Sequence, residues 1–278
     1  MPGTLFIVAT PLGNTEDLSP RARRVLAAAD AVLAEDTRRS GLLFQRLGLT
    51  ARRFLSFHDH NEAQRLPQVL AWLAEGQSLA LISDAGTPLL SDPGFRLVRA
   101  AREAGHAVVP VPGPSAPVTA LSACGLPPQP FVFLGFLPRK PGEVRKTLAP
   151  YAHLPASLVF FERKDRLGAS LSLAREVLGE RECCLARELT KAHEEFIVGT
   201  LSALAAGERE LLGELTVVVG PPLESARAEA AEVRRVVAEE SAAGGRPKEL
   251  ARRAAARCPG WTAKEIYELL AKDTPTAP

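Results

Sequence analysis

The first 111 residues contain five short apolar runs, each separated from the next by a polar loop and a segment with helical periodicity. The runs are Thr4–Ala9, Ala31–Ala34, Phe54–Phe57, Ser78–Ile82 and Ala107–Val111. Short, continuously apolar runs are typical of strands that are covered on both faces, as in a parallel sheet. Strict alternation of strands and helices requires right-handed crossovers. The pattern therefore predicts an N-terminal α/β domain built on a parallel sheet.

A proline-rich stretch at residues 124–130 interrupts this alternation and predicts a domain boundary, so we expect domains at residues 1–124 and 125–222. Further apolar runs begin at Phe131, Ser157, Cys183, Glu195 and Leu215. The third and fourth of these runs are joined by a short connection, which favours an antiparallel pair and hence a mixed sheet. The pattern is helical from Glu224 onward, so residues 223–278 are expected to form a helical C-terminal extension.

Composition narrows the class of protein. The 278 residues are 46% hydrophobic and 24% charged, as in a globular chain with a substantial core. The net charge of +2 is too small to indicate nucleic acid by itself. Four cysteines without a Cys-x-x-Cys pattern predict neither a disulfide framework nor a zinc site. No apolar run suits a membrane span and no basic start suits a signal peptide, so we expect a cytoplasmic protein without membrane contact.

The loop Ser83–Gly94 follows the fourth apolar run and precedes a helical pattern. Such loops lie at the carboxyl edge of a parallel sheet, where α/β proteins bind ligands. Asp84 and Asp92 supply hydrogen-bond acceptors there, and Asp92 equally suits the N-cap of the next helix. Ser115, after the fifth run, favours a helix cap over a ligand contact, and Asn61 is expected to cap the helix that follows it.

Several common sites are absent from the sequence. There is neither a Gly-x-Gly-x-x-Gly nor a Gly-x-x-x-x-Gly-Lys pattern, so neither a dinucleotide fold nor a P-loop is predicted. His58 and His60 have metal-ligand side chains, but their spacing matches no recognised signature and favours a solvated loop. A metal-dependent phosphohydrolase that uses these two histidines with Asp84 and Asp92 is kept as an alternative.

Five motifs occur in order along the chain: Val8–Asn14 (VATPLGN), Glu35–Arg38 (EDTR), Ser83–Pro88 (SDAGTP), Pro112–Ala116 (PGPSA) and Arg187–Glu195 (RELTKAHEE). Together they resemble the tetrapyrrole-methylase-like superfamily. Within it, the chain is similar to the bacterial small-subunit ribosomal RNA methyltransferase I family, which methylates the ribose 2′-hydroxyl of a decoding-centre cytidine. The resemblance covers nearly the whole chain. One motif departs: the family usually has Glu-x-Pro-His-Arg where this chain has Glu162–Arg166 (ERKDR).

The resemblance implies two α/β domains, S-adenosylmethionine as methyl donor, 16S ribosomal RNA as substrate and a homodimer. The residues that it implies for binding the donor are Pro11, Leu12, Asp84, Ala85, Gly86, Thr87, Ser115, Ala116, Phe161, Glu162 and Thr216. Methyl transfer to a hydroxyl needs alignment together with a base or a cation near the oxygen. The candidates for this catalytic role lie in the segments 187–188, 191–194 and 35–38. Of these residues Glu188, Lys191, His193 and Arg38 are preferred, and the sequence leaves the choice of base open.

Binding to RNA requires clusters of basic side chains rather than a large total charge. Two such clusters are present: Arg21, Arg23, Arg24, Arg38, Arg39, Arg46, Arg52 and Arg53; and Arg139, Lys140, Arg145 and Lys146. A solvated helical face explains any single arginine equally well. Two alternatives therefore stay open beside an RNA methyltransferase: a methylase of a tetrapyrrole or other small acceptor, and an RNA-binding protein without activity.

Overall fold

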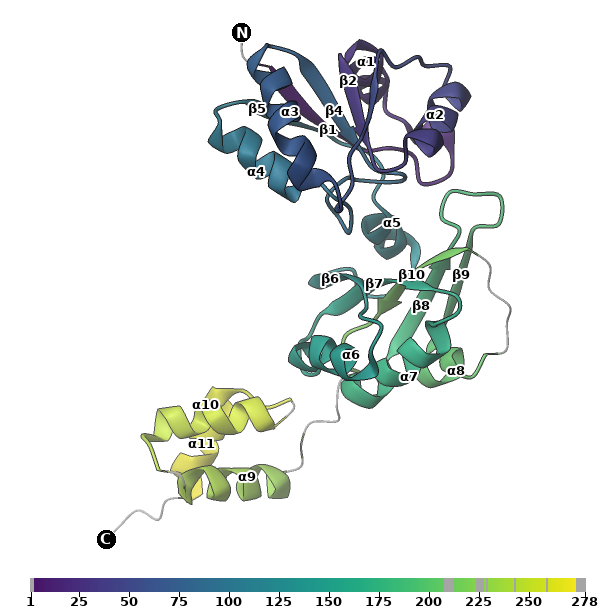
Figure 1. The fold of residues 1–278 in the computed structure, drawn as a ribbon. Coiled ribbons are helices and arrows are strands. Elements are labelled where there is room, and N and C mark those ends of the chain that lie inside the picture. The colour runs from purple at the N-terminus through teal and green to yellow at the C-terminus, as the bar shows by residue number, and fades with distance from the viewer. Residues whose placement is uncertain are drawn as a thin grey trace. The chain divides into compact units, whose positions relative to one another are not determined.

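The first five apolar runs form one parallel sheet in the computed structural model, which describes residues 3–207, 213–223, 228, 230–242, 244–258 and 260–273 (Figure 1). The strands of this sheet are β1 (Thr4–Val8), β2 (Ala31–Ala34), β3 (Phe54–Ser56), β4 (Ser78–Ile82) and β5 (Ala107–Val111). Their order is β3-β2-β4-β1-β5, and every neighbouring pair is parallel. The predicted parallel sheet is confirmed.

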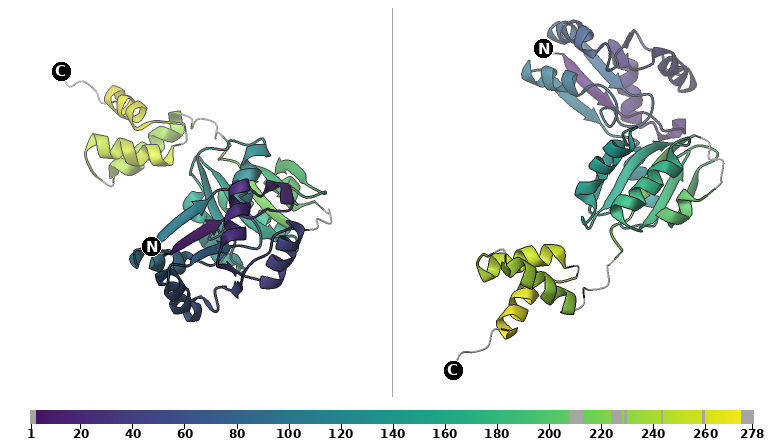
Figure 2. Two further views of the ribbon diagram at one scale, coloured as in Figure 1. Left: turned by 90° about the horizontal axis from the view of Figure 1, so that it is seen from above. Right: turned by 60° about the horizontal axis from the view of Figure 1, so that its bottom comes forward.

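Helices cover both faces of this sheet (Figures 1 and 2). They are α1 (Pro20–Ala28), α2 (Thr37–Arg46), α3 (Glu62–Ala74) and α4 (Phe95–Glu103), with a 3-10 turn at Thr15–Asp17. Leu26 of α1 and Phe44 of α2 are buried against one face, whereas Leu73 of α3 and Leu97 of α4 are buried against the other. Because both faces are covered, the strands carry apolar residues continuously, as the sequence pattern indicated.

Side chains that were predicted to cap helices are used differently. Asn61 lies at the N-cap position of α3, but its Oδ1 accepts a hydrogen bond from the backbone N–H of His58 at 2.9 Å. The N-cap of α4 is Gly94 rather than Asp92, because the loop continues two residues further before the helix begins. Ser115 precedes α5 (Ala116–Ala123), but its side chain makes no cap hydrogen bond. The side-chain caps predicted for Asn61 and Ser115 were wrong, and of the two roles left open for Asp92 the structure does not show the N-cap.

The second sheet is mixed, as predicted. Its strands are β6 (Phe131–Phe136), β7 (Ser157–Arg163), β8 (Glu182–Arg187), β9 (Glu195–Thr200) and β10 (Glu214–Val219), in the order β6-β7-β10-β8-β9. Only β6 and β7 are parallel, and the other neighbouring pairs are antiparallel. The expected hairpin between β8 and β9 is therefore present, and the loop that joins these strands contains the last of the five sequence motifs.

Helices also flank the second sheet. On one face lie α6 (Pro141–Leu148), the 3-10 turn Ala149–Tyr151, α7 (Leu167–Leu178) and α8 (Leu201–Ala205). On the other face, Leu121 of α5 belongs to the same core cluster as Val218 of β10. Helix α5 thus packs on the second sheet although it precedes the predicted boundary at residue 124. Residues 1–221 form one compact unit, and the division inside it stays a prediction.

Arg181 links three segments of the second half of this unit through hydrogen bonds. The residue is fully buried, yet its guanidinium has no carboxylate partner among the described residues. It donates instead to the carbonyl oxygens of Leu178, Gly220, Tyr151 and Ala152, at 3.3, 3.3, 3.2 and 2.6 Å. One buried cation therefore satisfies carbonyls from α7, from the end of β10 and from the turn after α6.

Residues 222–278 form a second unit. Its helices are α9 (Ala230–Ala242), α10 (Pro247–Arg257) and α11 (Ala263–Asp273), which confirms the helical extension, while residues 224–227 of the predicted helical pattern lie outside the described ranges. Val233, Ala254 and Ile266 form its small core. Across both units, none of the helices in the described ranges combines the length and apolarity that a bilayer crossing requires.

Candidate active site

Hydrogen bonds join three loops at the carboxyl edge of the first sheet. The backbone N–H of Thr10, after β1, donates to the carbonyl of Gly86, after β4, at 2.8 Å, and Gly86 donates back at 3.0 Å. The Thr87 hydroxyl donates to the carbonyl of Pro114, after β5, at 2.9 Å. Gly86 has a φ of +79°, which other residues rarely adopt. The three loops are thereby fixed as one wall.

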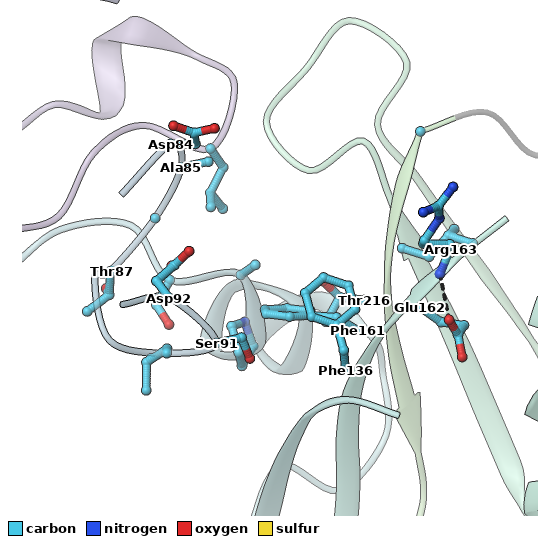
Figure 3. A pocket seen from close by; sticks show the side chains of 18 of the residues that line it. Asp84, Ala85, Thr87, Ser91, Asp92, Phe136, Phe161, Glu162, Arg163 and Thr216 are labelled. Carbon is cyan, nitrogen blue, oxygen red and sulfur yellow. Dashed lines mark hydrogen bonds between the residues drawn. The ribbon is translucent and has the colours of Figure 1, made fainter. Parts of the chain in front are cut away.

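This wall faces a cavity of about 660 Å³, whose opposite wall is the second sheet and its loops (Figure 3). The volume lies within the range of small-molecule sites. Every residue predicted to bind the donor lines this cavity except Pro11, which is buried beside it. The sequence interpretation missed Arg39, Leu90, Ser91 and Phe136, which also line it, and it placed Glu35 in a candidate catalytic segment rather than at the donor site.

Asp84 is the carboxylate of the first wall. Its Oδ2 accepts a hydrogen bond from Nη1 of Arg39, on α2, at 3.0 Å. Its Oδ1 is buried and has no hydrogen-bond partner among the described residues. A buried acceptor without a donor raises the free energy of the folded state. This oxygen is therefore well suited to accept a hydrogen bond from a ligand.

The second wall is aromatic. The ring of Phe161, in β7, lies 5.2 Å from that of Phe136 and 5.0 Å from that of Phe133, measured between centroids. Thr216 of β10 is paired with Phe161 across the sheet. In Figure 3 the side chain of Phe161 points towards the cavity. This surface is suited to a planar, weakly polar ring.

Glu162 lines the cavity through its backbone, since its carboxylate points to the other side of β7 (Figure 3). There Oε2 accepts a hydrogen bond from the Ser170 hydroxyl at 2.5 Å and lies 3.2 Å from Nη2 of Arg166. The alternation of side chains along a strand sends Phe161 and Glu162 to opposite faces. The outer pair of the altered motif thus forms an ion pair between a buried glutamate and a partly exposed arginine at the start of α7.

The predicted catalytic residues Glu188, Lys191 and His193 lie in the loop between β8 and β9 and do not line the cavity. Nζ of Lys191 is 3.0 Å from Oε1 of Glu188. The loop contacts the first half of the unit, because the Thr190 hydroxyl accepts from the Asn14 N–H at 3.1 Å. The Lys191 side chain packs so closely on Gly13 that a Cβ there would overlap it, and Glu188 is packed in the same way on Gly213 at the cavity wall.

Arg38, the fourth predicted catalytic residue, also lies outside the larger cavity. Its side chain is 90% exposed, and its Nη2 is 3.1 Å from Oδ2 of Asp36. Hydrogen bonds from Arg38 lower the pKa of the Asp36 carboxyl to about 2. Arg38 instead lines a second cavity, of about 490 Å³, together with His58 and His60.

Backbone strain marks the two loops that the sequence singled out. Among the described residues, the non-glycine residues with positive φ are Leu89 (72°), Ser91 (70°), Glu188 (50°) and Thr190 (64°). Two lie in the loop after β4 and two in the loop after β8. Such conformations cost free energy and persist where the surrounding structure or a function requires them.

The residues of the phosphohydrolase alternative are divided between two cavities. Asp84 and Asp92 line the larger cavity, and His58 and His60 line the smaller one. In the described parts of the chain, no group of three or more His, Cys, Asp or Glu side chains is placed to hold a metal ion.

Comparison with known proteins identifies the family. Residues 4–205 match the model of the Tetrapyrrole (Corrin/Porphyrin) Methylases. The chain belongs to the tetrapyrrole methylase family. It is 47% identical over 97% of its length, and 92% of the other, to a Mesorhizobium japonicum protein named ribosomal RNA small subunit methyltransferase I. A protein of the same name from Escherichia coli O157:H7 is 49% identical over 78% of this chain and 77% of its own. Together with the family match, these relatives identify the chain as a methyltransferase.

Solved structures of tetrapyrrole methylases share the fold. The methyltransferase CobJ superimposes with a TM-score of 0.61 at 21% identity, covering 79% of this chain and 93% of its own. Uroporphyrin-III C-methyltransferase from Thermus thermophilus, in complex with S-adenosylhomocysteine, has a TM-score of 0.58 at 18% identity, covering 78% of this chain and 97% of its own.

Proposed function

We propose that this methyltransferase transfers a methyl group from S-adenosylmethionine to the 2′-hydroxyl of a decoding-centre cytidine in 16S ribosomal RNA. The observation that carries the proposal is the cavity of about 660 Å³ behind the three linked loops. It occurs in a chain whose relatives, 41–49% identical, carry the name ribosomal RNA small subunit methyltransferase I. Their shared name supports RNA of the small subunit as the substrate.

The cavity fits the methyl donor on three counts. Phe161 and Leu12 offer apolar surface to a planar base. The unpartnered Oδ1 of Asp84 suits an ammonium or ribose hydroxyl donor. The N-terminus of α5, at Ser115 and Ala116, lines the cavity, and a helix start of this kind suits a carboxylate.

Part of the basic surface is available for phosphate contacts. Arg21 and Arg24, on α1, are exposed and have no hydrogen-bond or ion-pair partner among the described residues. Other members of the cluster are occupied: Arg52 binds Asp30 at 2.7 Å, and Arg53 stacks 4.7 Å from the Trp72 ring centroid. We therefore assign the first phosphate contacts to α1 rather than to the whole cluster.

The reaction has three requirements that the protein must meet: alignment of donor and ribose, exclusion of water and acceptance of a proton. The donor supplies an activated methyl group and its own leaving group. The chain must hold donor and ribose in line, which is the role of the linked loops and the aromatic wall. It must also exclude water and accept the proton of the attacking hydroxyl.

The test is methylation of small ribosomal subunits isolated from cells that lack this activity. Incubation with methyl-labelled donor should add one methyl group to a cytidine ribose, located by nuclease digestion and mass spectrometry. Labelling of a base, or of a tetrapyrrole in place of RNA, would overturn the proposal. We also propose that the protein is a homodimer and that it is located in the cytoplasm. Light scattering tests the first of these, and cell fractionation tests the second.

A further inference from the structure

Glu35 occupies a special position at the edge of the first sheet. It is the first residue after β2, and the neighbouring strand β4 ends at Ile82, two residues before Asp84. From β2 the chain continues outward to β3, whereas from β4 it continues to β5 at the opposite edge. In open α/β sheets, ligands bind at such points, where connections diverge.

Two cavities meet at this residue. The larger cavity, assigned above to the donor, has Glu35 in its wall. The smaller cavity, of about 490 Å³, is formed by Glu35 with the start of α2 and the loop after β3. Among the described residues, Glu35 is the one that lines both cavities. A group placed there reaches a molecule in either cavity.

The Glu35 carboxylate is not neutralised by an ion pair. No hydrogen bond or ion pair joins it to another described residue, because Arg39, the nearest cation on α2, binds Asp84. The Glu35 side chain is exposed, and it opens onto both cavities. Partial desolvation raises the pKa of Glu35 above its ordinary value, and the charges of Asp84 and Asp59 raise it further. His58 and Arg39 act in the opposite direction. A carboxylate with a raised pKa that is accessible from a cavity is suited to accept a proton from a molecule bound there.

His58 gives an independent indication that the smaller cavity binds a polar molecule. The Asn61 amide is oriented by two bonds, from the His58 backbone N–H to Oδ1 and from Nδ2 to the Ser56 carbonyl. Nδ2 therefore also donates to Nε2 of His58, at 3.1 Å, which places the ring proton of neutral His58 on Nδ1. This Nδ1–H is buried and has no hydrogen-bond partner among the described residues. It is a donor that still lacks an acceptor.

We propose that the smaller cavity binds the acceptor nucleoside and that Glu35 is the catalytic base for its ribose hydroxyl. This inference rests on the proposed function. The hydroxyl oxygen bonds to the methyl carbon while the carbon–sulfur bond breaks, and its electron pair stays on sulfur. The hydroxyl proton passes to the Glu35 carboxylate. The Nδ1–H of His58 donates to an oxygen of the bound nucleoside and so orients it.

The test replaces the carboxylate by an amide of the same shape. Glu35→Gln should lower the single-turnover rate of methyl transfer to small ribosomal subunits by at least about 100-fold, the usual size of a general-base contribution. Donor affinity, measured by calorimetry, should change by less than about twofold, since only an interaction of the reaction step is removed. Glu35→Asp, which keeps a carboxylate, should recover part of the rate.

The pH profile provides a second readout. The base acts only when ionised, so the wild-type rate should fall as pH decreases through the raised pKa of Glu35, and Glu35→Gln should lose this dependence. The groups that face Glu35 are Asp84, Asp59, His58 and Arg39. His58→Gln should raise the KM for the subunits, whereas the fall of the rate at low pH should remain. This result would distinguish the role of His58 in orienting the nucleoside from the role of Glu35 in proton transfer.

Glu103→Gln, on α4, is the matched control, because it makes the same change at an exposed carboxylate outside both cavities. Wild-type methylation of the ribose together with a fully active Glu35→Gln would overturn this inference and leave the proposed function standing. Wild-type protein that methylates no ribose would overturn both. Unfolding midpoints of the variants, measured in parallel, exclude misfolding as the cause of a lost rate.

Discussion

Arg39 and Asp84 join helix α2 to the loop after β4 through an ion pair of 3.0 Å between Nη1 and Oδ2. The side chain of Arg39 is 71% exposed and that of Asp84 is 26% exposed, so the pair contributes at most about 1 kcal/mol to stability. Its main effect is therefore on orientation. With Oδ2 held by Arg39, the buried Oδ1 is left for a ligand.

Asp84→Ala should weaken binding of S-adenosylmethionine by about 10-fold or more, the usual effect of losing a hydrogen bond to a charged group. Isothermal calorimetry measures this change. The unfolding midpoint should stay close to that of the wild type, because the ion pair that is lost is partly exposed and contributes little to stability. Arg39→Gln keeps the Asp84 carboxylate and should weaken binding less. Equal affinities for Asp84→Ala and wild type would remove Asp84 from the donor site.

Glu188→Ala and Lys191→Ala should each reduce methyl transfer more than they reduce donor affinity. Their ion pair lies outside the cavity, but Glu188 packs on Gly213 of its wall and Lys191 packs on Gly13. Loss of either side chain is expected to displace these contacts, and small displacements cost about 100-fold in rate. Single-turnover assays with labelled donor measure the effect. The exposed pair Arg99–Glu103 provides the control, as Arg99→Ala, and full activity in both loop variants would make the loop structural only.

Charge reversal at Arg21 and Arg24 should weaken RNA binding and spare donor binding. For each phosphate contact that is lost, the slope of log affinity against log salt concentration should decrease by about 0.7 to 0.9. Filter binding of small-subunit RNA at several salt concentrations gives this slope. Arg102→Glu, on α4 at the opposite face of the same sheet, makes the same charge change as either single substitution on α1 and should leave RNA affinity nearly unaltered. Equal losses from both faces would indicate non-specific attraction.

Arg181→Met should lower the free energy of unfolding by about 3 kcal/mol or more, because four carbonyls, two of them buried and two partly buried, lose a donor. Urea denaturation of the two proteins measures the difference. Arg175→Met removes an arginine whose side chain is 58% exposed and pairs with Glu180, and should cost no more than about 1 kcal/mol. Similar midpoints for the two variants would show that water replaces the guanidinium of Arg181.

The sequence predicted the elements of the fold well where burial is complete. All four residues of β2 are buried, so their unbroken apolarity identified the strand directly. Helix caps were harder to predict, because they depend on which hydrogen-bond partner a side chain has in the folded protein. The amide of Asn61 binds the preceding loop and not the helix, a choice that becomes apparent only when the loop before α3 is folded.

The site was predicted in part for a related reason. The loops around Asp84 and Ser115 were identified because they follow apolar strands, and both line the cavity. Glu35 follows the apolar strand β2 in the same way, and its segment was named as a catalytic candidate, but the sequence did not show that it lines the same cavity. The face of β7 to which the Glu162 side chain points could not be predicted, because β7 is buried on both faces and shows no alternation of polar and apolar residues. The long-range pairing of Thr10 with Gly86 leaves no local pattern.

That pairing has a consequence for engineering. The two bonds between Thr10 and Gly86 involve backbone atoms on both sides, so the shape of the wall does not depend on the chemistry of the side chains around it. Leu90, which lines the cavity from the same loop, is consequently a position where volume and polarity can be varied while this link is kept. A library at this position is a rational starting point for enzymes that accept enlarged donor analogues and transfer groups other than methyl to RNA.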